Sequence, residues 1–433
     1  MGHKYLIFST KTKSLRIQAE LYTELLVVTE RGSRNIEAMS SNLSQNQYHR
    51  IQHFISESPW SARELIDSVA LDVNELFKGR KSVGLLLDES SEEKKGDSSV
   101  GVAHQYCGNL GKLANCQVAV YATLCSDEHF SIIDAELYLP ESWVNDTAKR
   151  KKAGVPEAIA YKKKAQIALD MIQRIQAAGI RFDYVAADSL YGHDPEFREG
   201  LDKMGILHVV DTHKDTRIYT ERFEIEVPQK KSGSKGKTPT VAKPNKPCLR
   251  VDKYMAGLVE SDWTKVVLRN GSKGALVSQV HGREIFIEEN GVCKKRTLII
   301  RKTNEHGKER IHYIIANQSL ATCTAALLAE YQCTRFYIEQ SFREAKQNIG
   351  MCDYQVRGWL AWNHHTALSI MAMAFFTMEK LENEKDIPLL SYKDIRDMII
   401  ANYLEEIEPL PVEEKIAQRH QKRQNDINRY YNT

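Results

Sequence analysis

The spacing of apolar residues changes along the chain, and the first change comes near residue 81. Residues 13–80 place apolar positions at helical spacing and lack the alternation of a strand, which predicts a series of short helices. The clearest helix start is Ser61, followed three residues later by Glu64, because this spacing is typical of a capping box. We therefore expect a small helical domain at residues 1–80.

From Val83 the pattern becomes a continuous apolar run that ends in a carboxylate, VGLLLD. Such a run is typical of a strand buried on both faces, and it would place Asp88 at the C-terminal end of that strand. Residues 116–124 and 131–138 alternate like two further strands, so we predict an antiparallel meander of three.

The same signal recurs after a predicted helix at about residues 161–178. The run FDYVAAD is apolar and closes on Asp188. A helix that begins near Pro195 and a strand at 207–210 extend this α/β unit.

Strand patterns return between Thr216 and Asn317, in TKVVLRN, GREIFIEE, KRTLIIRK and RIHYIIAN, and they predict a β-rich insertion. Within it, residues 228–247 hold six lysines and no acid, so we expect a mobile basic loop there. A long helix over about 322–349, a second over about 358–381 and a charged helical tail complete the chain.

Composition limits the classes of function only weakly. The 60 Lys and Arg residues against 57 Asp and Glu give a net charge of +3, too small to prove a polyanionic partner. The eight cysteines are spread singly, without the pairs of a zinc site, and we expect them to be reduced. The N-terminus lacks the pattern of a signal peptide, and the most apolar stretch, 367–376, is too short to span a bilayer. We therefore expect a cytoplasmic protein that does not enter a membrane.

Three acids are candidates for metal chemistry. Two buried strands that end in Asp88 and Asp188, and a later helix that carries Glu339, can bring three carboxylates to one edge of a sheet. At separations of about 5 Å such charges repel by roughly 3 kcal/mol per pair at an effective dielectric near 20, so a divalent cation is needed. All-oxygen ligands favour Mg²⁺ or Mn²⁺, and two ions roughly 4 Å apart suit phosphodiester chemistry. The alternative is that each acid merely ends its element or is solvated.

At these residues the chain resembles bacterial insertion-sequence transposases of the DDE class, which have an RNase H-like core. The resemblance covers about residues 30–380 and rests on LLLDESSEEKKGDSSVGVAHQYCGNLGKLANCQVAV, VAADSLYG and RFYIEQSFREAKQNIGMCDYQVRGWLAWNHHTALSIMAMAF. Arg335, Glu339 and Lys346 keep the spacing of the family's tyrosine-arginine-glutamate-lysine signature, whereas Tyr331 lies one residue farther away. The chain also departs after Asp88, where this group commonly has a threonine and a glycine two and three residues on.

The resemblance implies an enzyme that nicks the ends of its element and joins the freed 3′-hydroxyls to target DNA. It implies that Asp88, Asp188 and Glu339 bind the two metal ions and that duplex DNA with terminal inverted repeats is the substrate. We expect a homodimer on DNA, because two ends must be paired, and association with the nucleoid. Two alternatives remain open, an RNase H-like nuclease without strand transfer and a catalytically decayed DNA-binding protein.

Several basic residues are candidates for contacts with DNA. Arg335 and Lys346 share a helix face with Glu339 and would hold phosphates, although a surface ion pair between residues four apart is the alternative. Lys94 and Lys95 could contact the DNA backbone, with solvation as the alternative, and Arg357 has either a DNA-facing or a structural role. The family signature implies a contact with DNA for Tyr331 as well. The helix near 47–56 either enters a groove of DNA or is an ordinary surface helix.

The predicted fold is therefore α/β, an RNase H-like mixed sheet with a β-rich insertion and an N-terminal helical domain. The predicted domains are a helical DNA-binding domain at 1–80, the first part of the catalytic core at 81–215, the insertion at 216–317, the second part of the core at 318–383 and a helical tail at 384–433.

Overall fold

The structure is a computed structural model of the protein. It describes residues 7–9, 14–40, 45–229, 237–238, 240–271, 274–305, 308–406 and a few positions after 412. Residues 230–236 and 239 of the predicted basic loop at 228–247, and most of the tail after residue 406, lie outside the described residues. Among the described residues, no helix combines the length and the apolar character needed to cross a membrane.

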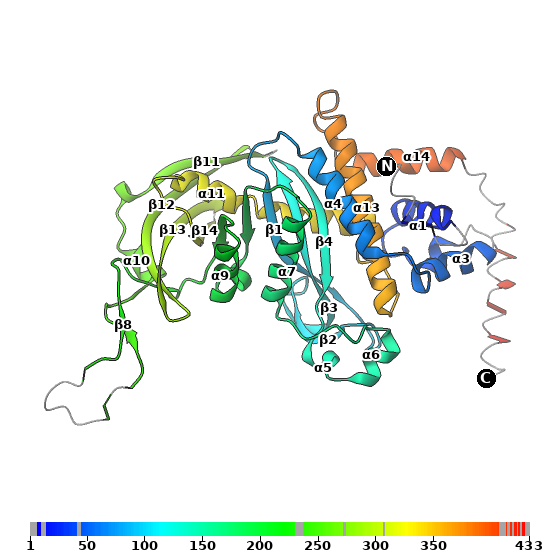
Figure 1. The fold of residues 1–433 in the computed structure, drawn as a ribbon. Coiled ribbons are helices and arrows are strands. Elements are labelled where there is room, and N and C mark those ends of the chain that lie inside the picture. Colours follow the sequence, from blue (N-terminus) through cyan, green and yellow to red (C-terminus); the bar gives the residue numbers. More distant parts are fainter. Residues whose placement is uncertain are drawn as a thin grey trace.

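The N-terminal segment is helical, as predicted. Its helices are α1 (Arg16–Val28), α2 (Ile36–Met39), α3 (Gln45–Ser56) and α4 (Ala62–Leu76). The Ser61 hydroxyl accepts a hydrogen bond from the Glu64 backbone N–H at 3.2 Å and so caps α4. Helices α1, α3 and α4 pack against α13 (Trp359–Glu382), and both α4 and α13 contact strand β4 (His129–Leu137) of the sheet (Figure 1).

Two buried histidines of α13 join this helix to the N-terminal helices. The His365 Nδ1 lies 2.8 Å from the Tyr22 hydroxyl of α1, and the His364 ring stacks on Trp60 with centroids 3.8 Å apart. Both histidines are fully buried and hydrogen-bonded. They therefore serve the packing of the helical layer.

The central sheet has the strand order of an RNase H-like fold. Its five core strands are β1 (Gly84–Glu93), β3 (Lys112–Ser126), β4 (His129–Leu137), β5 (Tyr184–Ala187) and β6 (His208–Asp211). The antiparallel strands β1, β3 and β4 form the predicted meander, and β5 and β6 lie on the other side of β1, parallel to it. The mixed sheet confirms the predicted fold class.

Asp88 does not end its strand, and this part of the prediction was wrong. Strand β1 pairs with β3 from Gly84 to Glu93, but its parallel pairing with β5 ends at Leu87. Asp88 is therefore the first residue of β1 beyond the end of β5. The polar residues that follow it remain in a strand because β3 continues beside them, so no turn forms after the first acid.

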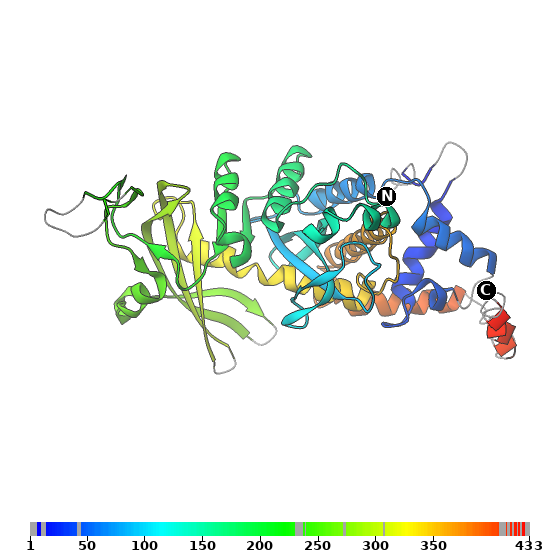
Figure 2. The same ribbon diagram turned by 90° about the horizontal axis from the view of Figure 1, so that it is seen from below.

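The β-rich insertion is continuous with the core sheet. Its strands are β11 (Thr264–Gly271), β12 (Gly274–Glu289), β13 (Val292–Glu305) and β14 (Lys308–Ala316). Strand β14 pairs with β6, and the result is one sheet of ten strands that includes β2 (Ala103–Cys107) at the far side. Seen from below, the long insertion strands lie at one end of the molecule and the N-terminal helices at the other (Figure 2). The exact domain boundaries stay predictions.

The remaining helices lie between and beside these strands. They are α5 (Glu141–Val144), α6 (Thr147–Ala153), α7 (Lys164–Ala177), α8 (Ser189–Gly192), α9 (Pro195–Lys203), α10 (Val251–Ala256) and α14 (Tyr392–Glu406). Short strand pairs also form between β7 (Arg217–Ile218) and β10 (Leu249–Arg250) and between β8 (Ile225–Glu226) and β9 (Lys243–Pro244).

The single long helix predicted at 322–349 is broken in the structure, so this prediction was wrong. It consists of α11 (Ala325–Cys333), α12 (Phe336–Glu344) and a π-helical turn η3 (Ala345–Ile349). At the break the Thr334 hydroxyl lies 2.7 Å from the Tyr331 carbonyl and 2.9 Å from the Tyr184 hydroxyl. This local hydrogen bonding competes with the helical ladder. Ile338 of α12 and Ile349 of η3 are fully buried, so this segment packs on the core in spite of the break.

Candidate active site

The candidate site lies where β1 continues past the end of β5. Asp88 is held there by its strand, and its Oδ1 accepts a hydrogen bond from the Glu89 backbone N–H at 2.8 Å. The side chain is only 16% exposed. A carboxylate in this position is fixed by the sheet and faces little water.

Asp188 follows β5 directly and caps the next helix. Its Oδ1 accepts a hydrogen bond of 2.9 Å from the backbone N–H of Leu190, at the start of α8. Because the end of β5 lies beside Leu87 of β1, Asp188 comes next to Asp88 across the parallel pair. The strand-end signal in the sequence thus predicted its position correctly.

Arg335, at the break before α12, lies among the carboxylates. Its Nη1 donates to Asp88 Oδ2 at 3.2 Å, and its Nη2 donates to Glu339 Oε1 at 2.9 Å. The pair with Glu339 is the expected contact between residues four apart. Arg335 is nevertheless only 18% exposed, and it also binds Asp88 on the sheet. Its interactions therefore go beyond those of a surface ion pair.

A fourth carboxylate, missed in the sequence analysis, belongs to this cluster. Asp211 ends β6, and its Oδ2 lies 3.5 Å from the Nε of Arg335, an ion pair without a hydrogen bond. Its Oδ1 accepts a hydrogen bond of 2.9 Å from the Gln332 side chain. The signal that marked Asp88 and Asp188 was present here too, since a buried apolar run, LHVVD, closes on this aspartate.

The electrostatics of the cluster are those of crowded acids around one cation. Burial and the neighbouring Asp188 raise the pKa of the Asp88 carboxyl well above its usual range, against the effect of Arg335. Burial and Glu89 raise the pKa of Asp188. Burial raises the pKa of Asp211 to about 6. Each shift means that ionising the group costs the folded protein free energy, which a bound cation would recover.

The donors suit a hard divalent cation, although their present arrangement is not closed. Asp88, Asp188 and Glu339 offer only oxygen, as Mg²⁺ and Mn²⁺ prefer. Within the part of the chain that the structure describes, no three His, Cys, Asp or Glu side chains lie close enough together to enclose a metal ion. The Glu339 side chain is 53% exposed and bonded to Arg335, whose guanidinium supplies the positive charge between the acids.

Lys346 lies on the C-terminal side of the site, in the π-helical turn η3. Its Nζ is 3.0 Å from Asn109 Oδ1, in the turn between β2 and β3, and 3.5 Å from the carbonyl of Ser91. Turns of this kind inside helices are frequent at functional sites. Lys346 is therefore held beside the part of β1 that follows Asp88.

The other predicted DNA-contacting residues are spread more widely. Tyr331 stacks on Tyr184 with centroids 3.9 Å apart, at the start of β5 and so at the opposite end of that strand from Asp188. Lys94 is packed over the Tyr354 ring at 3.8 Å and donates to the Tyr354 carbonyl. Lys95 and Arg357 are exposed. The structure thus groups Arg335 with the acids and leaves Tyr331 in a packing position.

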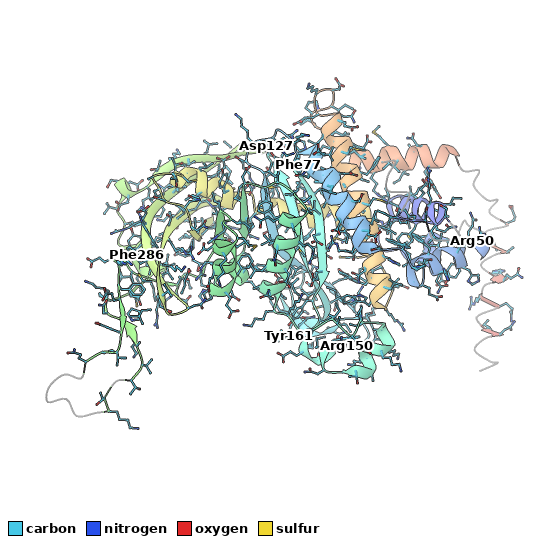
Figure 3. The ribbon with its side chains drawn as sticks, in the orientation of Figure 1. Arg50, Phe77, Asp127, Arg150, Tyr161 and Phe286 are labelled. Atoms are coloured by element: carbon cyan, nitrogen blue, oxygen red, sulfur yellow. The ribbon has the colours of Figure 1, made fainter. Side chains whose placement is uncertain are left out.

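Helix α3, the candidate for entering a groove of DNA, has two distinct faces. Ile51, Phe54 and Ile55 are buried, whereas Arg50 points outward (Figure 3) and His49, Gln52 and His53 are exposed. This amphipathic pattern fits either of the two interpretations of the helix.

Comparison with known proteins indicates the family of the chain. Residues 7–275 match the family described as DDE superfamily endonuclease. The "Probable transposase for insertion sequence element IS701" of Microchaete diplosiphon is 29% identical over 196 residues, which are 45% of this chain and 48% of that protein. The chain thus spans about half the length of this curated relative. The NurA nuclease of Sulfolobus solfataricus is 9% identical, covers 80% of this chain and 96% of its own, and has a TM-score of 0.24, too low for comparison of the folds. The family match covers more than half of this chain, and the chain therefore belongs to the DDE superfamily endonuclease family.

Proposed function

We propose that this protein is a DNA transposase that nicks the ends of its element and joins the 3′-hydroxyls to target DNA. The observation that carries the proposal is that Asp88 and Asp188 lie side by side on adjacent parallel strands, and that Arg335 binds both Asp88 and Glu339. The similarity to a protein described as a probable insertion-sequence transposase supports the same reaction.

Members of this endonuclease family generally use divalent metal ions. In our proposal Asp88, Asp188 and Glu339 hold two Mg²⁺ ions, or Mn²⁺. Such ions activate the attacking oxygen and stabilise the leaving oxygen of a phosphodiester. The exposed Glu339 side chain can turn toward the two aspartates when its bond to Arg335 opens.

Arg335 then has a second function in this proposal. It remains bound to Asp211. Its two Nη atoms, which Asp88 and Glu339 release when they bind metal, then donate to a DNA phosphate. Lys346 holds a neighbouring phosphate from its position beside Ser91. The substrate is duplex DNA with terminal inverted repeats, the protein acts as a homodimer on paired ends, and it is associated with the nucleoid.

The test is Mg²⁺-dependent cleavage and strand transfer on DNA that carries the inverted repeats found in the sequence flanking the gene. The native protein is compared with Asp188→Asn, which keeps the hydrogen bond to Leu190 but removes the charge. We expect the variant to bind the DNA and to lose both reactions. Equal activity in both proteins would contradict the three-acid site.

The products separate the two alternatives from the proposal. Cleavage without joined products would favour an RNase H-like nuclease that lacks strand transfer. Binding of the repeats without any cleavage by the native protein would favour a decayed, DNA-binding protein. Light scattering on the paired ends tests the dimer, because a mass of one chain would exclude it.

A further inference from the structure

A basic segment that the candidate site does not use lies between β4 and α7. Residues 147–164 contain six lysines and Arg150 against a single acid, Glu157. The chain as a whole carries almost no net charge, so this local excess is a property of the segment. Its first part is the short helix α6, and its last residue opens α7.

The segment is held firmly on the core. Trp143, in α5 just before it, is 2% exposed and donates its indole N–H to the Val102 carbonyl at 2.6 Å. Helix α6 ends at Gly154, whose φ of 69° suits glycine. Arg150 then donates to the carbonyls of Pro156 at 2.7 Å and Ile159 at 2.9 Å, which fixes the following loop. The lysines therefore project from a defined surface.

Most of these lysines have no acidic partner. Lys149, Lys151, Lys152 and Lys163 are exposed, and no carboxylate in the described part of the chain forms an ion pair with them. Lysines in the last turn of a helix are stabilising by about 0.3–1 kcal/mol through the helix dipole. This effect accounts for Lys151 and Lys152, but it does not extend to residues 162–164, which lie beyond α6.

The basic segment adjoins the acidic edge of the sheet. The Lys164 Nζ lies 3.0 Å from Oε1 of Glu89, the residue after Asp88. The other oxygen of Glu89 accepts a hydrogen bond of 3.0 Å from Tyr191, in the helix that begins after Asp188. Figure 3 shows Arg150 and Tyr161 at the end of the sheet opposite Asp127, which lies at the turn beside the start of β1.

We propose that residues 147–164 form a surface that binds the phosphate backbone of duplex DNA next to the active site. Duplex DNA carries one negative charge per about 1.7 Å of its axis, so DNA that lies at the carboxylate edge presents phosphates to adjoining cations. The exposed Lys149, Lys151 and Lys152 bind these phosphates without reading sequence. The inference rests on the proposed function in one respect, because that function identifies the ligand as duplex DNA.

The test measures DNA binding without catalysis. A fluorescein-labelled duplex of random sequence, about 40 base pairs long, is titrated with the full-length protein in EDTA at several NaCl concentrations. We compare the native protein with the triple variant Lys149→Gln, Lys151→Gln, Lys152→Gln. We plot the logarithm of the binding constant against log [NaCl]. We expect the slope of this line to be smaller in magnitude by roughly 2 to 3 in the variant.

The matched control is the triple variant Lys78→Gln, Lys203→Gln, Lys393→Gln, which removes the same charge from exposed lysines elsewhere. We expect it to keep the native salt dependence. Equal slopes for the two triple variants, or native protein that does not bind the duplex, would overturn the inference. If the first triple variant fails to fold, the single variants Lys151→Gln and Lys152→Gln should each reduce the slope by about 1. Because cleavage is not measured, loss of the proposed transposase activity would leave this result intact.

Discussion

The Nη1 atom of Arg335 lies 3.2 Å from the Oδ2 atom of Asp88, so a side chain from the break between α11 and α12 neutralises the first acid of the sheet. Burial lowers the pKa of the guanidinium, but the carboxylates around it, Asp211 first, outweigh burial and raise it. The protein thus carries its own cation among its acids, and the effect of removing it can be measured.

Replacing Arg335 by Gln should destabilise the protein by roughly 1–3 kcal/mol in EDTA, because the buried Asp88 loses a charged hydrogen bond and Asp211 loses an ion pair. Thermal unfolding with and without Mg²⁺ measures the effect. We expect millimolar Mg²⁺ to raise the melting temperature of this variant more than that of the native protein. The control is Arg343→Gln in α12, an exposed arginine that forms an ion pair with Glu344 and not with the acids of the site. An equal Mg²⁺ effect in all three proteins would argue against exchange of the guanidinium for metal.

Asp211 should make stability depend on pH. Its pKa is about 6 in the folded protein and about 4 in an unfolded chain, so the folded state binds this proton more tightly. The contribution of Asp211 to stability is therefore full below pH 4 and falls as the pH rises to 6. The total loss is about 3 kcal/mol.

The variant Asp211→Asn isolates this effect, since it resembles the protonated side chain at every pH. Urea unfolding at several pH values between 4 and 7 should show the native protein losing stability relative to the variant as the pH rises. Parallel curves would show that Asp211 does not take up a proton in this range.

A buried ion-pair network joins α9 to the insertion strands. Arg296, which is 4% exposed, donates to Asp202 Oδ2 at 2.7 Å, and Glu289, which is 2% exposed, accepts from Arg198 at 2.7 Å. Since removing one partner leaves a buried charge, Arg296→Ala should cost about 3–5 kcal/mol in the free energy of unfolding. Lys393→Ala, at an exposed pair, should leave the free energy of unfolding nearly unchanged. Similar losses in both variants would refute a special role for the network.

Much of the site was visible in the sequence because buried strands that end in an acid leave a simple pattern. Asp188 follows β5 as predicted. The same rule would have found Asp211, whose short strand was predicted to end one residue earlier. Asp88 was placed at a strand end because the polar residues after it carry no apolar alternation, whereas the pairing of β1 with β3 extends through them.

Other features depend on contacts that no local pattern reveals. The break before α12 contains neither glycine nor proline, and it rests on hydrogen bonds of Thr334 to Tyr331 and to the distant Tyr184. Likewise, the strands of the insertion were recognised, but their union with the core sheet depends on the pairing of β14 with β6. Only the folded chain brings these partners together.

Glu339 provides the sharpest test of the three-acid site. Glu339→Gln keeps an oxygen that can accept the hydrogen bond from Arg335, and the side chain is 53% exposed, so we expect little change in stability. Loss of the charge should reduce Mg²⁺-dependent cleavage by about a hundredfold or more, because a metal ligand is lost. Glu344→Gln is the matched control, since Glu344 lies on the same helix and bonds Arg343 and Asn348 instead of Arg335. If both variants cleave DNA as the native protein does, Glu339 is not a metal ligand, and the third acid must be sought among its neighbours, with Asp211 as the first candidate.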